Sequence, residues 1–241
     1  MGAFTGQTAI VTGASGAIGS AIAARLIASG ATTVLLGRTR RALEQVVSDL
    51  GWNPAAVRCC AVDLAAETQL RQFARDVRET CSQVNLLVHA AGAIVPAKIS
   101  DSHLSDLDLQ YTVNLRAPFH LTQALLPQLT ACAGQVVFVN SSAGMTAKAG
   151  VSQYAATKHA LRALADSLRD EVNQHGVRVL SVFLGRTASR MQAAVYAREG
   201  RVYRPDKLLQ PDDVASIILH ALGLPRTAEV TDLHIRPMVK S

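Results

Sequence analysis

The sequence predicts an α/β protein, in which one domain is built on a doubly wound, parallel sheet of seven strands with helices on both faces. Three observations carry this prediction. Short apolar runs of strand length alternate with longer stretches of helical periodicity along the whole chain. Most of the short runs are continuously apolar, as expected of parallel strands that are buried on both faces. The 241 residues suffice for one well-buried domain but are few for two.

The first half of the chain contains four of the expected strands. Residues 8–12 (TAIVT) form the first strand, and residues 17–29 form a helix that carries Ile18, Ile22 and Leu26 on one face. This alternation continues, and it is typical of parallel sheets with crossover helices. The following strand, helix, strand, helix and strand are expected at 32–37, 41–50, 57–62, 68–81 and 85–89.

The second half contains three more strands and the longest helices. A helical stretch at 104–131 includes Pro118 and Pro127, which we expect to bend the helix or to end it early. The last helix starts at Pro211, where the missing N–H is harmless because it falls in the first turn. The remaining elements are expected at 135–140 (strand), 151–174 (helix), 177–184 (strand), 211–222 (helix) and 229–235 (strand).

Composition excludes several classes of protein. No uninterrupted apolar run reaches the roughly 18 residues of a membrane helix, so we expect no membrane partner. The N-terminus has no basic region followed by an apolar stretch, which argues against a secretory signal and for a cytoplasmic protein. The net charge is +6, but no recognition motif accompanies it, so we expect no nucleic acid. A modest positive field instead suits a cofactor that carries several phosphates.

Metal binding is not expected either. The four cysteines show no CxxC spacing, and the seven histidines form neither an HxxxH nor an HExxH pattern. Cys59 and Cys60 are neighbours in a predicted strand, so their side chains point to opposite faces. We interpret all four cysteines as small apolar side chains in a reducing compartment.

A glycine-rich turn joins the first strand to the first helix. Glycines allow a tight turn and let backbone N–H groups approach a pyrophosphate at the start of the helix. The alternative is a turn without a ligand, but its position between the first strand and the first helix favours phosphate binding. The candidate cofactor-binding residues in this turn are Gly13, Ser15, Gly16, Ile18 and Gly19.

The end of the second strand indicates which nicotinamide cofactor to expect. Dinucleotide folds that select NAD usually place an acidic residue there, where it binds the ribose 2′-hydroxyl. This chain has Arg38 at that point, two further arginines close behind, and no acidic residue before Glu44. A guanidinium suits the 2′-phosphate of NADP in charge and in geometry. We therefore expect NADP(H), bound first by Arg38; the alternative is that these arginines form a solvated loop.

Three polar side chains are candidates for the chemistry. Tyr154 and Lys158 lie four residues apart in a predicted helix and therefore share a face. The ammonium of Lys158 and the charge of an oxidised nicotinamide both favour the phenolate, so we expect a lowered pKa for Tyr154. Ser141 precedes Tyr154 by thirteen residues and is placed to donate a hydrogen bond to a substrate oxygen. Ser142 is the alternative, which the interval and the Ser-x-x-Gly pattern ending at Gly144 disfavour.

Together these motifs resemble the short-chain dehydrogenase/reductase family over essentially the full length of the chain. The resemblance implies a single-domain, Rossmann-type enzyme that transfers a hydride between NADP(H) and a small carbonyl or alcohol substrate. It also implies a homo-oligomer, a tetramer or a dimer, formed through the two long helices. The residues that carry the resemblance follow one another along the chain in the order expected of the family. They are the loop from Thr12 to Gly19, Asp63-Leu64, Ala91-Gly92, Asn114, Ser141, Tyr154 with Lys158, and Gly185 with Thr187.

The resemblance implies a role for each marked residue. Tyr154 would act as the general acid/base and also contact the cofactor, and Ser141 would orient the carbonyl. Lys158 would lower the pKa of Tyr154 and bind the nicotinamide ribose, while Asn114 would hold a water that links Lys158 to solvent. Further cofactor contacts would come from Asp63 and Leu64 near the adenine, Ala90 and Gly92 near the ribose, and Gly185 and Thr187 near the nicotinamide or pyrophosphate.

Three positions depart from the family pattern. His89 and Ala90 stand where many relatives have two asparagines, and we interpret His89 as structural. Leu184 stands where a proline is common, so the following loop loses a fixed φ angle. Ala17 occupies a usual glycine position in the first loop, a tolerated variant.

Residues 186–210 are the expected substrate lid. This segment carries six basic residues but only two acidic ones, Glu199 and Asp206. One interpretation is a solvated surface, and the other is attraction of an acidic substrate or of one borne on an acidic carrier protein. The apolar and aromatic residues of the segment form either a pocket wall or packing within the lid: Met191, Val195, Tyr196 and Tyr203.

Two other functions are alternatives to the oxidoreductase. A dinucleotide-sensing regulator would bind NADP(H) without turnover, but such proteins on this scaffold typically lack the tyrosine or the lysine that this chain has. A sugar-nucleotide epimerase or dehydratase normally needs a larger C-terminal substrate region than this chain possesses.

Overall fold

The computed structural model describes residues 2–53 and 56–239, and it contains the expected parallel sheet. Within the described residues the sheet has seven strands in the order β3-β2-β1-β4-β5-β6-β7, and all neighbours are parallel. The doubly wound fold is therefore confirmed. The strands are β1 (Thr8–Thr12), β2 (Thr32–Gly37), β3 (Val57–Ala61), β4 (Leu86–His89), β5 (Gln135–Ser141), β6 (Arg178–Leu184) and β7 (Asp232–Ile235).

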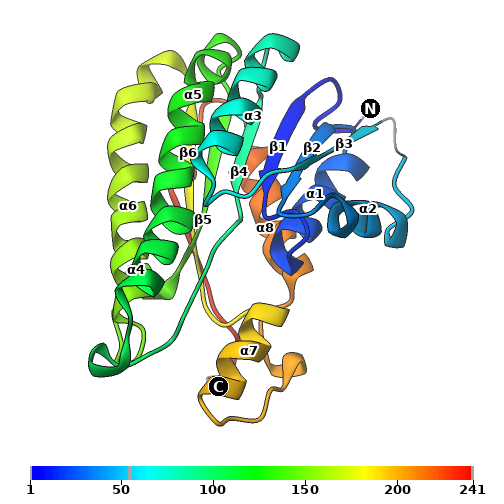
Figure 1. The fold of residues 1–241 in the computed structure, drawn as a ribbon. Coiled ribbons are helices and arrows are strands. Elements are labelled where there is room, and N and C mark those ends of the chain that lie inside the picture. Colours follow the sequence, from blue (N-terminus) through cyan, green and yellow to red (C-terminus); the bar gives the residue numbers. More distant parts are fainter. Residues whose placement is uncertain (1, 54–55, 240–241) are drawn as a thin grey trace.

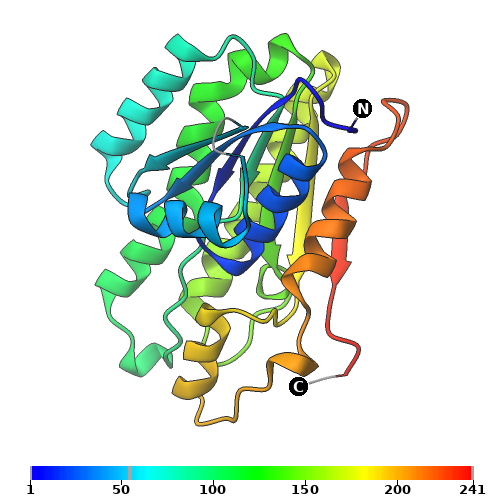
Figure 2. The same cartoon turned by 90° about the vertical axis from the view of Figure 1, so that its right-hand side faces the viewer.

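Helices cover both faces of this sheet. In Figure 1, α3, α5 and α6 lie on one side and α1, α2 and α8 on the other, while α7 lies apart, beyond one end of the strands. Figure 2 shows α8 running beside β7 at the edge of the sheet. Among the described helices, none is both long and apolar enough to cross a membrane. The helices are α1 (Ala17–Ala28), α2 (Arg40–Asp49), α3 (Glu67–Thr80), α4 (Leu104–Tyr111), α5 (Ala117–Ala131), α6 (Ser152–Val172), α7 (Arg190–Arg198) and α8 (Pro211–Leu222).

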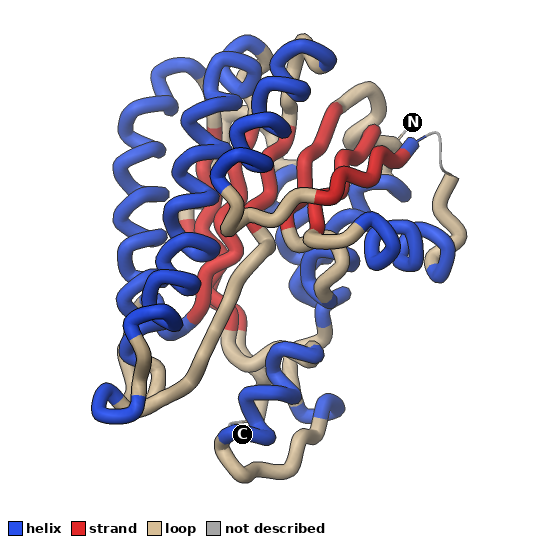
Figure 3. The backbone as a smooth tube through the Cα atoms, in the orientation of Figure 1, coloured by secondary structure: helices blue, strands red, loops and turns tan. Residues whose placement is uncertain are grey.

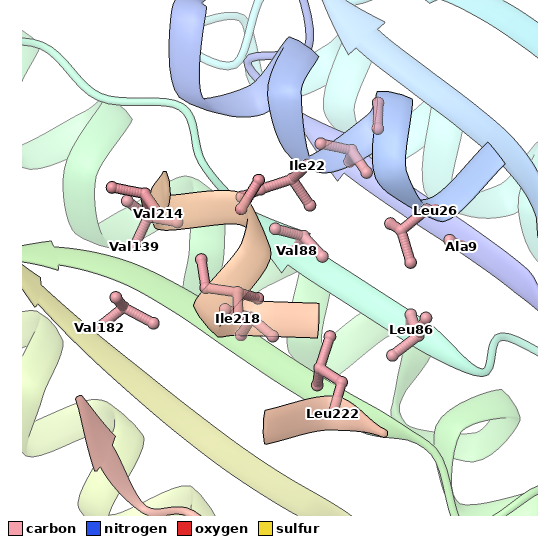
Figure 4. Packing of buried hydrophobic residues seen from close by; sticks show 14 of the residues in the cluster. Ala9, Ile22, Leu26, Leu86, Val88, Val139, Val182, Val214, Ile218 and Leu222 are labelled. Carbon is pink, nitrogen blue, oxygen red and sulfur yellow. The ribbon is translucent and has the colours of Figure 1, made fainter. Parts of the chain in front are cut away.

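Two apolar cores hold the three layers together, because successive strand residues point to opposite faces. In β5, Val137 and Val139 belong to the core under α1 and α8, whereas Val136 and Phe138 belong to the core under α3, α5 and α6. Figure 4 shows the first core, where α1 and α8 meet over the strands. Burial on both faces explains why the strand sequences are continuously apolar.

The helical stretch at 104–131 ends at neither of its prolines. It continues from α4 into α5 through a π-helical turn, Thr112–Arg116, in which the N–H of Ala117 bonds the carbonyl of Thr112. Pro118 has no N–H for the carbonyl of Asn114 four residues earlier, so this turn cannot keep the regular α pattern. Pro127 lies within α5 and does not end it. The hydrogen bonding of the helical stretch thus changes before Pro118, but the stretch does not end, so the expectation of an early end is wrong.

Candidate functional site

The carboxyl ends of β1, β4, β5 and β6 open into one cleft of about 570 Å³. Figure 3 shows these strands running into loops on the side that faces α7. Gly13 follows β1, Ala90 follows β4, Ser141 ends β5 and Gly185 follows β6, and all four line the cleft. Ligands of doubly wound sheets bind at such strand ends.

The turn after β1 has the shape of a phosphate cradle. Gly13 has a φ of 66°, and a Cβ atom there would lie 2.7 Å from the Cα of Ala91, so only glycine fits. A Cβ at Gly19 would collide with the carbonyl of Gly13. Gly16 starts α1 without a side-chain cap, and no acidic residue lies in the first turn. The first N–H groups of α1 therefore suit an anion such as a pyrophosphate.

Thr12 and His89 organise the loop after β4. The Thr12 hydroxyl accepts hydrogen bonds from the backbone N–H groups of Ala90 and Ala91, both at 3.2 Å. His89 is buried, with Nε2 2.9 Å from the hydroxyl of Thr122 and its ring stacked on that of Phe138. Burial lowers the pKa of His89 to about 3, so it is neutral at pH 7. Its contacts are those of a packing residue, as the sequence interpretation holds.

Tyr154, Lys158 and Ser141 come together in the cleft. Tyr154 and Lys158 face it from α6, and the Lys158 Nζ lies 5.8 Å from the centroid of the Tyr154 ring. The same Nζ donates to the carbonyl of Val139 at 3.0 Å. Ser141 hydrogen-bonds the Tyr154 hydroxyl, whereas no such bond involves the exposed Ser142. The segment that carries the serine is thus joined directly to the helix that carries the phenol and the amine.

Burial dominates the ionisation of both groups on α6. It raises the pKa of Tyr154, and the hydrogen bond with Ser141 only partly opposes this effect. It lowers the pKa of Lys158 to about 8. The sequence predicts the opposite direction for Tyr154, and that prediction is wrong for the chain's own groups because desolvation of the phenolate outweighs the nearby ammonium. A phenol that keeps its proton at neutral pH is suited to donate it.

Asn114 lies beside this group rather than in the cleft. Its side-chain oxygen accepts from the N–H of Ala93 at 2.7 Å. Its amide donates to the Ala93 carbonyl at 2.8 Å and to the Thr157 hydroxyl at 3.0 Å. Both amide hydrogens are therefore used in joining the loop after β4 to α6. The side chain of Asn114 therefore has a structural role in this arrangement.

The remaining predicted residues are spread over neighbouring strand ends. Arg38, after β2, is exposed, and Asp63, after β3, accepts from the N–H of Ala65 at 3.0 Å. Neither they nor Leu64 line the cleft, although the ends of β2 and β3 are paired through Gly37 and Ala61. The cleft-lining residues that match the prediction are Gly13, Ser15, Gly16, Ile18, Gly19, Ala90, Gly92, Ser141, Tyr154, Lys158, Gly185 and Thr187.

Two polar residues near the strand ends are missing from the sequence prediction. Ser189 lines the cleft and caps α7 by accepting from the N–H of Gln192 at 3.1 Å. A serine before a helical stretch is the signal that could have identified this cap. Asn140 bonds the backbone of Ser141 and of Lys158, and no local signal indicates it.

Two of the basic residues in the segment 186–210 share one carboxylate. Arg186 and Arg201 lie over the Tyr196 ring, with guanidinium carbons 4.5 Å and 5.2 Å from its centroid. Glu199 accepts from Arg186 with both carboxylate oxygens at 2.8 Å and lies 3.5 Å from Arg201. Met191 and Val195 line the cleft beside this group. Two of the six cations of the segment are therefore neutralised in part by one carboxylate.

Among the described residues, no group of three or more histidine, cysteine or acidic side chains is placed to hold a metal ion. The four cysteines are free and half-buried, and burial raises the pKa of the thiols of Cys59, Cys60 and Cys132. Raised thiol pKa values are typical of unreactive cysteines.

Comparisons with known proteins point to one family. The family model of the short chain dehydrogenases matches residues 7–200. An uncharacterized oxidoreductase of Staphylococcus aureus is 29% identical over 241 residues, which cover 99% of this chain and 100% of the relative. An uncharacterized oxidoreductase of Staphylococcus epidermidis is 30% identical over 233 residues, or 96% and 97% of the two chains.

Solved structures of similar proteins share the fold. A metagenomic short-chain oxidoreductase in complex with NADP is 29% identical, with a TM-score of 0.83 over 99% of this chain and 100% of that one. A Shigella flexneri protein described as a short chain dehydrogenase, complexed with NADP, is also 29% identical. Its TM-score is 0.86, over 96% of this chain and 97% of that one.

Proposed function

Because the chain belongs to the short chain dehydrogenase family, we propose that it is an NADP(H)-dependent oxidoreductase that interconverts a carbonyl and an alcohol, with Tyr154 as general acid/base. One observation carries this proposal. The phenol of Tyr154, the hydroxyl of Ser141 and the amine of Lys158 meet in one cleft, which the glycine-rich turn after β1 also lines. That combination supplies a proton donor, an oxygen-binding group and a phosphate cradle side by side.

The residues of the cleft fit a nicotinamide dinucleotide. Gly13, Ser15, Gly16, Ile18 and Gly19 line the cleft, and the absence of a Cβ at Gly13 and Gly19 lets the backbone of the turn approach a pyrophosphate. Two similar structures hold NADP, which favours the phosphorylated cofactor. In this proposal Arg38 binds the 2′-phosphate. The adenine side is contacted by Asp63 and Leu64, the ribose by Ala90, Gly92 and Lys158, and the nicotinamide end by Gly185 and Thr187.

A bound nicotinamide supplies or accepts the hydride. In the reducing direction, the Ser141 hydroxyl donates a hydrogen bond to the substrate oxygen, and Tyr154 donates its proton to that oxygen as negative charge develops. The ammonium of Lys158 stabilises the phenolate that Tyr154 leaves behind. Asn114 supports the return of a proton from solvent through a water held at its backbone carbonyl. In the oxidising direction the same groups act in reverse.

Residues 186–210 are proposed as the substrate lid, with a pocket for an uncharged group. Ile94, Met191 and Val195 provide apolar lining near the reacting groups. Glu199 already pairs with Arg186 and Arg201, so these two cations are not free to attract an acidic substrate. These paired arginines favour the interpretation without an anionic substrate, whereas Arg190, which lines the cleft and forms no ion pair among the described residues, favours the other.

One experiment separates this function from that of a dinucleotide-sensing regulator. Purified protein is mixed with NADPH and a panel of ketones, aldehydes and quinones, and oxidation of NADPH is followed at 340 nm. We expect turnover of at least one substrate, and a loss of turnover in Tyr154→Phe that leaves NADPH binding intact. NADPH binding without turnover of any panel member would favour the regulator.

A further inference from the structure

Asn140 lies directly before Ser141 and joins two of the segments that form the cleft. It is 3% exposed. Its side-chain oxygen accepts a hydrogen bond from the backbone N–H of Ser141 at 2.8 Å, and its amide donates to the carbonyl of Lys158 at 3.1 Å. We propose that Asn140 is a positioning residue that holds Ser141 and Lys158 in register for proton transfer. This inference rests on the function proposed above.

The first consequence concerns Lys158, which is bound to β5 at both of its ends. Its Nζ donates to the carbonyl of Val139, and its own carbonyl accepts from the next residue of the strand, Asn140. The bond through Nζ sets the position of the amine, whereas the bond from Asn140 sets the position of the helix backbone that carries it. Without Asn140, the polar links between α6 and this end of β5 would all run through α6 side chains, those of Lys158 and Tyr154, and none would hold the helix backbone.

The second consequence concerns the hydroxyl of Ser141. The Asn140 oxygen holds the Ser141 N–H, and the Ser141 hydroxyl oxygen accepts from the N–H of Ala143 at 3.1 Å. A hydroxyl has one hydrogen to donate and two lone pairs. With one lone pair used by Ala143, its hydrogen is directed to the Tyr154 hydroxyl, the oxygen beside which a substrate oxygen would bind. Asn140 thus fixes the backbone from which this donor projects.

Gly144 packs closely against the side chain of Asn140. A Cβ atom on Gly144 would lie 2.6 Å from the Asn140 oxygen and 2.8 Å from the Lys158 carbonyl oxygen. The close approach of Asn140 and Lys158 at this point therefore requires glycine at 144. An amide is also the side chain that can accept from one backbone and donate to another at this length.

The test compares Asn140→Leu with a matched change elsewhere in the sheet. Leucine has a similar volume but makes neither hydrogen bond. The control is Asn85→Leu, because the Asn85 oxygen also accepts from a backbone N–H, that of Thr8 at 2.8 Å, at the opposite end of the strands. Measurements are kcat and KM with the best substrate of the panel, the Kd for NADPH, and the melting temperature.

We expect Asn140→Leu to lower kcat by about 100-fold, the effect of a misplacement near 1 Å. The KM and the Kd for NADPH should change much less than kcat, because Ser141 and Lys158 stay present to bind substrate and ribose and lose only their alignment for proton transfer. Asn85→Leu should lower the melting temperature but keep kcat per folded molecule. If Asn140→Leu likewise lowers only the melting temperature, the positioning role is overturned.

A second readout does not depend on turnover. The Ser141 hydrogen bond lowers the pKa of Tyr154 against the effect of burial. Displacing Ser141 should therefore raise that pKa further. An NMR titration of the tyrosine ring carbons, assigned with Tyr154→Phe, should show this rise in Asn140→Leu and not in Asn85→Leu. An unchanged Tyr154 titration would contradict the proposal even if no substrate is found.

Asn140→Asp keeps the proposal falsifiable if the leucine variant does not fold. A carboxylate still accepts from Ser141 but donates to the Lys158 carbonyl only when protonated. Its kcat should therefore recover as the pH falls below 7, where Tyr154 and Lys158 of the wild type are already protonated, and a pH profile identical to that of wild type would overturn the proposal. Tyr154→Phe separates the two proposals. If this variant retains the kcat of wild type, the proposed function fails. If Tyr154→Phe is inactive but Asn140→Leu is fully active, only the role of Asn140 is removed.

Discussion

The buried amine of Lys158 donates to the backbone carbonyl of Val139, 3.0 Å away, across the boundary between α6 and β5. One hydrogen bond to a neutral carbonyl does not replace the hydration of an ammonium, and burial accordingly lowers the pKa of Lys158 to about 8. The protein thus holds a charge that is costly in this position. A residue retained at such a cost points to function rather than to stability.

Replacement of Lys158 by methionine should stabilise the fold at neutral pH while it abolishes turnover. The pKa of Lys158 is about 8 in the folded chain and about 10.4 in the unfolded chain, so between these pH values only the unfolded chain binds the proton. The stability of the wild type therefore rises with pH from 8 to about 10.4. Below pH 8 the variant should exceed wild type by about 2 kcal/mol in the free energy of unfolding, after loss of the bond to Val139. Urea unfolding at pH 7 and pH 10 measures this difference, and a less stable variant at pH 7 would contradict it.

The buried His89 should make the protein sensitive to acid. Its pKa of about 3 lies below the ordinary value of about 6.5, so the unfolded chain binds a proton in this window and the folded chain does not. Stability should fall with pH below 6.5 by up to about 1.4 kcal/mol per unit from this residue. His89→Asn should flatten that slope in urea unfolding at pH 7, 5 and 4. The exposed His175→Asn is the control, and equal slopes in both variants would refute the assignment.

Arg38→Asp should reverse the preference for NADPH over NADH. Removing a charge-assisted contact to the 2′-phosphate is expected to weaken NADPH by 10- to 100-fold (about 1.5–3 kcal/mol), while NADH loses little. Fluorescence titration with both cofactors measures the two Kd values. Lys98→Asp, an equally exposed change of the same charge on another surface, controls for the net field. Equal losses for NADPH and NADH in Arg38→Asp would rule out a 2′-phosphate contact.

The pair formed by Arg186 and Glu199 should set the charge preference of the lid. In the wild type, a neutral ketone and a matched anionic ketone should have similar values of kcat/KM, at low and at high salt. The reason is that Glu199 is bonded to Arg186 and close to Arg201. Glu199→Gln releases both cations and should raise kcat/KM for the anionic ketone several-fold at low salt, an advantage lost at high salt. A wild-type preference for the anionic ketone that salt abolishes would instead support attraction of an acidic substrate.

The exposed apolar side chains of α4 and α5 should form part of an interface between copies of the chain. Leu104 is 78% exposed, and Leu109, Tyr111 and Phe119 are 43–48% exposed on the same helical stretch. We propose a homo-oligomer, a tetramer or a dimer, through this face. Phe119→Asp should shift the mass seen by light scattering toward a smaller species, whereas Val202→Asp, on the proposed lid, should not. Identical masses for Phe119→Asp and wild type would count against this face.

Much of the fold could be predicted because its signals are local. The apolar runs of the strands, the glycine turn after β1 and the four-residue interval between Tyr154 and Lys158 all depend on residues close in sequence. The π-helical turn before Pro118 could not be predicted in this way. A missing N–H shows where a helix is weakened, but the surrounding contacts decide whether it ends there or changes its hydrogen bonding.

The sequence by itself determined the α/β class, the order of the elements and the candidate side chains for the chemistry, because these depend on side-chain type and periodicity along the chain. Only the tertiary structure decided the raised pKa of Tyr154, the bonds of Asn140 to Ser141 and Lys158, and the pairing of Arg186 with Glu199. These depend on which distant segments exclude water from a group and which donor reaches it. Desolvation and hydrogen-bond geometry arise only when the segments are packed together.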